Sequence, residues 1–194
     1  GLVSNETITD ALTGLPTRTY SGAPHPVVGT YTGVYSANVI PAANGNYAIS
    51  VVNGDLSVIP ADKLLITIHG TSAVYGTTTA SNAGALATNV TAEYVDSGSN
   101  LISNLSNLRN IGSNHWAADD STGLTVTFDT YALNPQQSGA NLLKVGNYTF
   151  AATNIPAGAY SNFNGSVSNG GTLEITRLAI TPTANNFSKV YDGT

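Results

Sequence analysis

The sequence predicts an all-β protein, and two features of its pattern support this prediction. Apolar and polar residues alternate in many short segments, with the period of two that half-buried strands require. Between these segments stand short runs of Gly, Asn, Asp and Ser, which accept the positive φ of tight hairpin turns. We therefore expect small β-rich modules with a sandwich-like or β-grasp-like fold.

The alternation is clearest in six segments, which we predict to be strands: residues 46–52, 55–59, 64–68, 124–128, 172–176 and 177–181. Residues 91–103 and 115–129 should form hairpins, because each has turn residues between two apolar runs. Leu65 and Ile68 cannot share one face of a strand, so at least one of them should pack against a neighbouring module or a second sheet. The predicted core comprises Leu65, Ile68, Val74, Val126, Phe128, Tyr148, Phe150, Leu173 and Ile175.

One stretch, residues 99–112, is compatible with either a helix or a strand. Leu101, Leu105 and Leu108 share one helical face, and Gly112 is a suitable residue to end a helix. The Asn and Ser residues between them are poor helix formers, which favours strand or loop. Both alternatives stay open at this level.

The composition limits the classes of partner. Charged residues make up 9% of the 194-residue chain, against about 25% in an ordinary soluble domain. The surface must therefore be rich in Asn, Thr and Ser, which is typical of extracellular proteins. Six basic residues against eleven acidic ones provide no basic patch for nucleic acid. The longest apolar runs are far shorter than the ~20 residues of a spanning helix, so we expect no membrane-embedded segment.

The residues that most often carry catalysis form no recognisable group. There is no cysteine, which excludes thiol chemistry and disulfides. His25 lies between two prolines, and His69 ends a predicted strand with no second His or paired carboxylate nearby. His115 precedes the only Trp, and no nucleophile or phosphate-binding motif occurs. We therefore expect no enzymatic activity and no cofactor.

Two sets of residues are candidate binding sites. Asp119 and Asp120, with Asp129 across the predicted hairpin, could supply oxygen ligands to Ca²⁺. Their spacing is not that of an EF-hand, and we interpret them as surface acids beside a turn, so we expect no metal site. Exposed aromatic rings can stack on sugars. The candidates for such glycan stacking are Trp116, Tyr94 and Tyr131.

An internal repeat is the most informative feature of the sequence. VVGTYT at 27–32 recurs as KVGNYT at 144–149, and NGDLSV at 53–58 recurs as GGTLEI at 170–175, both displaced by 117 positions (145 − 28 and 173 − 56). AVYGT at 73–77 recurs in KVYDGT at 189–194, displaced by 116 positions (191 − 75). We therefore divide the chain into the C-terminal part of a first repeat (1–62), a complete second repeat (63–177) and the opening strand of a third (178–194). These modules are expected to lie end to end in an elongated particle.

The repeated motifs resemble those of MBG domains, the mostly β, glycine-rich modules of large bacterial adhesins. The resemblance includes GLVSNET at 1–7, NYAISVVNGDLSVIPA at 46–61 and LLITIHGTSAVYGT at 64–77. VGNYTF at 145–150, GGTLEITRLAITP at 170–182 and KVYDGT at 189–194 are similar to the same pattern and to the companion YDG repeats. The complete copy departs from YDG in that Tyr75 is followed by Gly and Thr without the Asp, and it is longer than the family unit.

This resemblance implies a stalk segment of a filamentous-haemagglutinin-like surface adhesin, which spaces or presents an adhesive region. The implied location is extracellular, attached to the outer membrane of a Gram-negative bacterium, and the implied partners are neighbouring repeats of the same protein. The alternative is a carbohydrate-binding module that contacts an exopolysaccharide or host glycan through exposed Tyr and Trp residues. We also expect residues 178–194 to add as a strand to residues 1–60 of a neighbouring molecule, head to tail.

Overall fold

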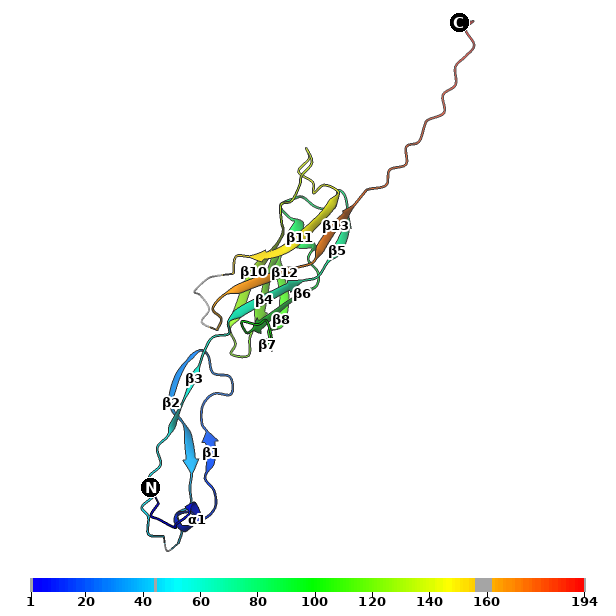
Figure 1. Ribbon diagram of the computed structural model, residues 1–194. Helices are drawn as coiled ribbons and strands as arrows, with labels where there is room; N and C mark the ends of the chain where they lie inside the picture. The colour runs from blue at the N-terminus through cyan, green and yellow to red at the C-terminus, as the bar shows by residue number, and fades with distance from the viewer. Residues whose placement is uncertain (1, 44, 156–161, 194) are drawn as a thin grey trace.

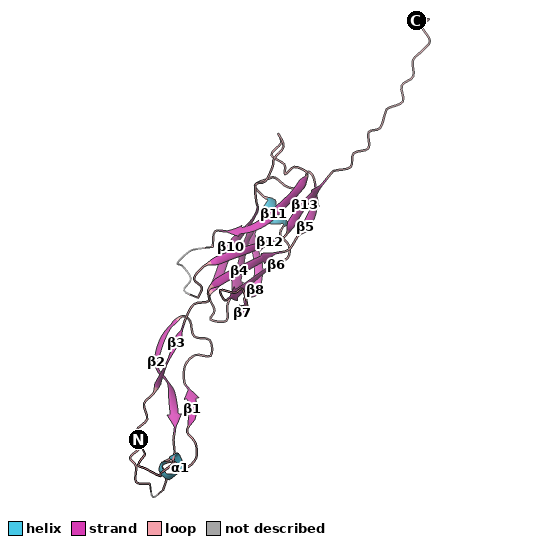
Figure 2. Cartoon of the chain, in the orientation of Figure 1, coloured by secondary structure: helices cyan, strands magenta, loops and turns pink. Residues whose placement is uncertain are grey.

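The computed structural model describes residues 2–43, 45–155 and 162–193, and its regular structure is almost entirely β (Figures 1 and 2). This confirms the predicted all-β character. The helices are a short α1 (Ile8–Ala11) and a 3₁₀ helix, η1 (Ala83–Leu86). The strands are β1 (Thr17–Tyr20), β2 (Gly29–Asn38), β3 (Gly54–Val58), β4 (Lys63–Ile68), β5 (Thr71–Val74), β6 (Val90–Val95), β7 (Leu101–Asn104), β8 (Ser106–Gly112), β9 (His115–Asp119), β10 (Thr125–Ala132), β11 (Gly146–Thr153), β12 (Ser166–Gly170) and β13 (Thr172–Thr176).

Strands β4 to β13 form two sheets around one apolar core (Figure 1). The six-stranded sheet has the order β5-β13-β11-β10-β9-β8, and the four-stranded sheet has the order β12-β4-β6-β7. Leu64 and Ile66 of β4 face inward from one sheet, and Val126 and Phe128 of β10 face inward from the other. Their side chains belong to the same buried cluster, which is the arrangement of a β-sandwich. We call this unit the sandwich.

Two strand pairs pass side by side from one sheet of the sandwich to the other. β4 pairs in parallel with β12 in the four-stranded sheet, and β5, the strand after β4, pairs in parallel with β13, the strand after β12. The backbones come closest at Gly70 and Gly171, where the Gly171 amide donates a 2.6 Å hydrogen bond to the Ile68 carbonyl. A Cβ atom on Gly171 would overlap the backbone nitrogen of Gly70. This crossing therefore requires glycine.

The remaining strands form a three-stranded antiparallel sheet of order β1-β2-β3. Its β2–β3 hairpin has the register of β11–β13 in the sandwich. Tyr31 lies opposite Leu56, and Tyr148 lies opposite Leu173, so both partners are displaced by 117 positions. β1 lies beside β2 as β10 lies beside β11. The internal repeat is thus also a repeat of strand pairing.

Most of the predicted core is buried in the sandwich. Val74 is an exception and a correction, because it is 41% exposed on the outer face of the edge strand β5. Leu65 is half-buried, whereas Ile68 joins the core that is shared with the six-stranded sheet. One member of this pair thus packs against a second sheet, as expected from the period of a strand. The buried members of the predicted set are Ile68, Val126, Phe128, Tyr148, Phe150, Leu173 and Ile175.

Two of the predicted strands are wrong, namely residues 46–52 and 177–181, neither of which is a strand in the structure. A strand requires a partner for its backbone hydrogen bonds, and among the described residues no strand pairs with either segment. The other four predicted strands overlap β3, β4, β10 and β13, and both predicted hairpins are present as β6–β7 and β9–β10. Residues 99–112 contain two strands, β7 and β8, and no helix.

Candidate functional site

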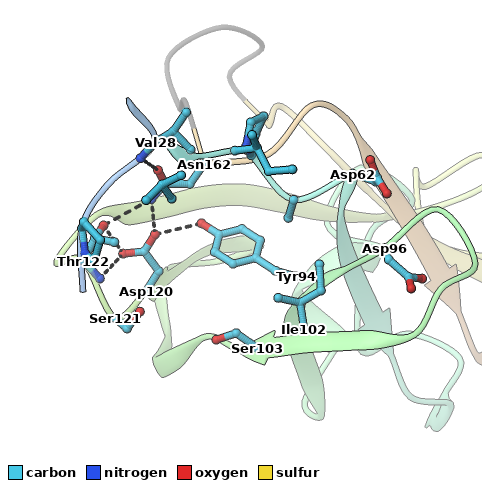
Figure 3. A pocket seen from close by; sticks show the side chains of 15 residues that line it. Val28, Asp62, Tyr94, Asp96, Ile102, Ser103, Asp120, Ser121, Thr122 and Asn162 are labelled. Carbon is cyan, nitrogen blue, oxygen red and sulfur yellow. Dashed lines mark hydrogen bonds between the residues drawn. The ribbon is translucent and has the colours of Figure 1, made fainter. Parts of the chain in front are cut away.

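A cleft of about 490 Å³ lies where the three-stranded sheet meets the sandwich (Figure 3). Val28 and Ile59 line it from the N-terminal side, and Tyr94, Ile102 and Asp120 line it from the sandwich. The side chains of Tyr94 and Asp120 point toward each other (Figure 3). The cleft therefore combines an apolar wall with one buried carboxylate.

Asp120 is 7% exposed and accepts hydrogen bonds through both carboxylate oxygens. Its Oδ1 accepts from the amide and the hydroxyl of Thr122, at 2.8 and 2.7 Å, and from the amide of Leu124, at 3.0 Å. Its Oδ2 accepts from the Tyr94 hydroxyl at 3.0 Å and from the Asn162 side-chain amide at 2.6 Å. These bonds occupy the carboxylate's acceptor positions.

The local sequence explains how Asp120 reaches this position. Asp, Thr and Gly are turn formers, and the side chain of Asp120 binds the backbone of the following turn between β9 and β10. Burial acts to raise the pKa of Asp120, but hydrogen bonds from Thr122, Asn162 and Leu124 outweigh it and lower the pKa below its ordinary value. Asp120 is therefore a carboxylate held in its charged form by neutral donors.

Asn162 connects this carboxylate to the three-stranded sheet. Its side-chain nitrogen donates to Asp120, and its side-chain oxygen accepts a long 3.4 Å hydrogen bond from the backbone amide of Val28. Its backbone carbonyl accepts from the amide of Ala61, at 2.9 Å, in the segment that joins β3 to β4. Asn162 is not predicted as a site residue from the sequence, because only its spatial neighbours distinguish it from the other Asn residues of this chain.

The other carboxylates near the cleft also stabilise turns. Asp62 Oδ2 accepts a 2.7 Å hydrogen bond from the amide of Ser97, and Asp96 Oδ1 accepts a 2.8 Å bond from the amide of Asn100. Within residues 2–43, 45–155 and 162–193, no group of three or more His, Asp and Glu side chains is placed to hold a metal ion. The carboxylates that line the cleft, Asp62, Asp96 and Asp120, therefore all accept hydrogen bonds from backbone amides.

The three acids considered as calcium ligands point in different directions. Asp120 faces the cleft, whereas Asp119 lies on the outer face of the sheet and forms a 3.0 Å ion pair with Arg109. Hydrogen bonds from Thr125, Asn107 and Arg109 lower the pKa of Asp119 to about 2. The structure therefore does not bring Asp119 and Asp120 to one ligand position.

Asp129, the third acid, contacts His115 and the side-chain amide of Asn154, the latter at 2.5 Å. Partial burial acts to raise the pKa of Asp129, while the hydrogen bonds from Asn154 and His115 lower it below its ordinary value. The other two histidines, His25 and His69, are exposed and lie outside the strands. The three histidines therefore do not meet.

The three candidate glycan-stacking residues occupy different surroundings. Trp116 is buried on the inner face of β9, where its indole N–H donates to the Thr130 hydroxyl at 3.3 Å. Tyr94 is buried in the other sheet, beside Asp120. Only Tyr131 lies at the surface, with 36% of its area exposed on the outer face of β10. The three rings therefore form no common stacking platform in this structure.

No helix among the described residues is long and apolar enough to cross a membrane.

Comparison with known proteins assigns no family to this chain and no function to the cleft. No protein-family model, no curated protein and no solved structure matches this chain.

Proposed function

We propose that this chain is a structural segment of a bacterial cell-surface adhesin, a stalk that spaces or presents an adhesive region. The observation that carries the proposal is the repeated antiparallel strand pair, in which Tyr31 opposite Leu56 and Tyr148 opposite Leu173 recur at a displacement of 117 positions. Tandem units with the same pairing are the construction of repeat proteins, whose stability comes from each unit and its neighbours. In such a protein, the tandem units give the molecule a defined length and direction.

The chemistry of the joint between the units supports the same proposal. Asp120 and Asn162 hold the start of β10, the strand β6 and the backbone at Val28 in one hydrogen-bond network. A buried network whose members all have partners restricts movement, because breaking it leaves unpaired polar groups. A stalk needs such stiff joints, and needs no free reactive group at them.

The surface composition favours an extracellular place for this stalk. Only 9% of residues are charged. Polar uncharged residues keep such a chain soluble without the dense charge of an ordinary domain. We therefore propose that the units lie end to end on the outer surface of a Gram-negative bacterium.

Small-angle X-ray scattering tests the arrangement of the units. A compact 194-residue chain has a radius of gyration of about 16 Å, and we expect a clearly larger value together with a long maximum dimension. A chain that ends at Thr176 is the matched control, since it removes the contribution of residues 177–194. A value of about 16 Å for this shorter chain would contradict the stalk.

Labelling of intact cells tests the location. Antibodies raised against this chain should bind the unbroken source bacterium, and the signal should disappear after treatment of whole cells with protease. Signal that appears only after cell lysis would contradict a surface stalk.

The alternative, a carbohydrate-binding module, has less support from the geometry. Sugar stacking needs an accessible aromatic face, and of the three candidate rings only Tyr131 has one. A glycan array probed with the wild type and a Tyr131→Ala variant separates the two functions. Binding that depends on Tyr131 would favour the module over the stalk.

A further inference from the structure

The inner face of the three-stranded sheet is less covered than the equivalent face of the sandwich. In the sandwich, Tyr148, Leu173 and Ile175 are 8%, 0% and 2% exposed. Their equivalents in the three-stranded sheet are all only half-buried; they are Tyr31, Leu56 and Val58. The same apolar pattern is therefore present in both places, and only one of them has a complete cover.

Two strands provide that cover in the sandwich. β4 places Leu64 and Ile66, both 0% exposed, in the same core as Leu173. β5 pairs in parallel with the edge of β13, with Ala73 opposite Ile175. In the three-stranded sheet, β3 occupies the position of β13, and no strand among the described residues pairs with its outer edge. This sheet thus has an open edge next to an open apolar face.

Residues 177–190 carry the sequence of these two covering strands. RLAIT at 177–181 matches KLLIT at 63–67, so that Leu178 corresponds to Leu64 and Ile180 to Ile66. KVY at 189–191 matches AVY at 73–75, displaced by 116 positions (191 − 75), whereas the first match is displaced by 114 (178 − 64). Leu178 and Ile180 are 56% and 81% exposed, whereas their equivalents are fully buried. An apolar strand sequence is therefore displayed without the sheet that it fits.

We infer that β3 and the inner face of the three-stranded sheet form an acceptor site for residues 177–190 of a second copy of this chain. The sandwich supplies the expected register. Glu174 lies opposite Ser72, and their equivalents are Ser57 and Ser188. Residues 187–190 therefore pair in parallel with β3, while Leu178 and Ile180 cover Leu56.

The position of residues 177–193 favours a second molecule over the same one. They leave the sandwich at the end of β13 and run away from the three-stranded sheet (Figure 1). Pairing within one chain would need this segment to return along the sandwich. Pairing between molecules needs no return, and it repeats head to tail, which is the heterologous contact that generates open filaments.

Sedimentation of the intact chain is the first test. We expect the average mass to rise with concentration up to about 1 mM, the Kd of a very weak interface. An Ile180→Asp variant should remain monomeric, because it places a charge in the acceptor's apolar face. Asn185→Asp is the matched control, since it adds the same charge to the same segment outside the matched strands. It should associate as the wild type does.

Disulfide trapping tests the register directly, because the chain has no cysteine of its own. A chain with Ser57→Cys, made distinguishable by a mass tag, is mixed with an untagged chain with Ser188→Cys. We expect a mixed dimer in at least several-fold higher yield than with Asn185→Cys. A Ser72→Cys and Glu174→Cys double variant is the positive control, because these residues are opposed within the sandwich.

Two results would overturn the inference: an intact chain that stays monomeric up to about 1 mM, or equal trapping at positions 188 and 185. The inference rests on the repeated pairing and not on the adhesin role. A monomeric chain with a large radius of gyration would reject the acceptor site and leave the stalk standing. A compact chain that is trapped in the expected register would support the acceptor site and reject the stalk.

Discussion

Tyr31 and Tyr148, which are 117 positions apart, make the same hydrogen bond. Each phenolic hydroxyl donates to the backbone carbonyl four residues earlier, Tyr31 to Val27 at 2.7 Å and Tyr148 to Lys144 at 2.9 Å. Such a bond, from a Tyr at the start of a strand back to the preceding corner, also occurs in immunoglobulin-like sandwiches. The two repeats therefore share a detail of tertiary structure as well as a motif.

Removing the Tyr148 hydroxyl should weaken the sandwich. Tyr148→Phe deletes the donor to Lys144 while leaving the buried ring, and we expect a loss of about 1 kcal/mol in the free energy of unfolding. Urea denaturation followed by circular dichroism measures it. Tyr131→Phe, on the outer surface of β10, is the control and should change little. Equal effects of the two variants would show that the bond contributes nothing.

The crossing at Gly171 should not tolerate a side chain. A Cβ atom there overlaps the backbone of Gly70, and overpacking of this kind costs about 1–3 kcal/mol or more. We expect Gly171→Ala to lower the melting temperature strongly or to prevent folding. Gly139→Ala is the control, because a Cβ atom added at Gly139 would have no neighbouring atom within 4 Å. A Gly171→Ala protein as stable as that control would mean that the two strand pairs do not cross this closely.

Asp120→Asn should destabilise the joint near neutral pH. Asn keeps one oxygen as an acceptor, but its amide nitrogen replaces the other oxygen and cannot accept the hydrogen bonds made there. Hydrogen bonds to a charged group contribute about 1.5–3 kcal/mol. The difference from wild type should shrink in acid, because a carboxyl with a lowered pKa loses its contribution as it becomes protonated. Denaturation at several pH values measures both effects. A difference independent of pH would contradict the charged state.

Asp119 should contribute to the acid sensitivity of the fold. Its pKa is about 2 in the folded chain and about 3.9 in an unfolded one. A lowered pKa stabilises the fold above the unfolded value, and this contribution is lost as the pH falls from about 4 to about 2. The melting temperature of Asp119→Asn should therefore fall less steeply than that of wild type over this range. Parallel curves would contradict the low pKa.

A chelator should leave the melting temperature unchanged. Asp120 accepts hydrogen bonds at both oxygens, and Asp119 accepts from Arg109 and Thr125. A tightly bound ion would raise stability with the logarithm of its saturation. Differential scanning calorimetry with and without EDTA measures this, with calcium-loaded EDTA as the control for ionic strength. A fall of several degrees would require a metal site that these contacts do not provide.

The predicted strands that were right and those that were wrong differ in one respect. β4 and β10 alternate as the sequence predicts, and each has a partner strand on both sides. Residues 46–52 alternate equally well, yet they form no strand. In the second repeat, the segment about 117 positions after residues 46–52 includes β12, which pairs with β4. Periodicity thus identifies a segment able to be a strand, while pairing decides whether it becomes one.

The candidate site shows the same division. Neighbouring carboxylates at 119 and 120 look alike in sequence, and alternation along the strand predicts only that they face opposite sides. Which side is buried depends on Tyr94 and Asn162, which are distant in the chain and contact Asp120. Trp116 was a candidate for sugar stacking because a lone Trp can be either a surface ring or a core residue. The structure shows that it is buried and donates to the Thr130 hydroxyl.

The sequence by itself determined the all-β character, the positions of the two predicted hairpins and most of the inward-facing residues. These depend on alternation and on turn residues, which act over a few neighbouring positions. The tertiary structure alone decided the parallel crossing at Gly70 and Gly171, the burial of Asp120 and the uncovered face around Leu56. Each of these depends on backbone or side-chain partners that are far away in the chain, and no local pattern records which distant segment will satisfy a strand edge or a buried carboxylate.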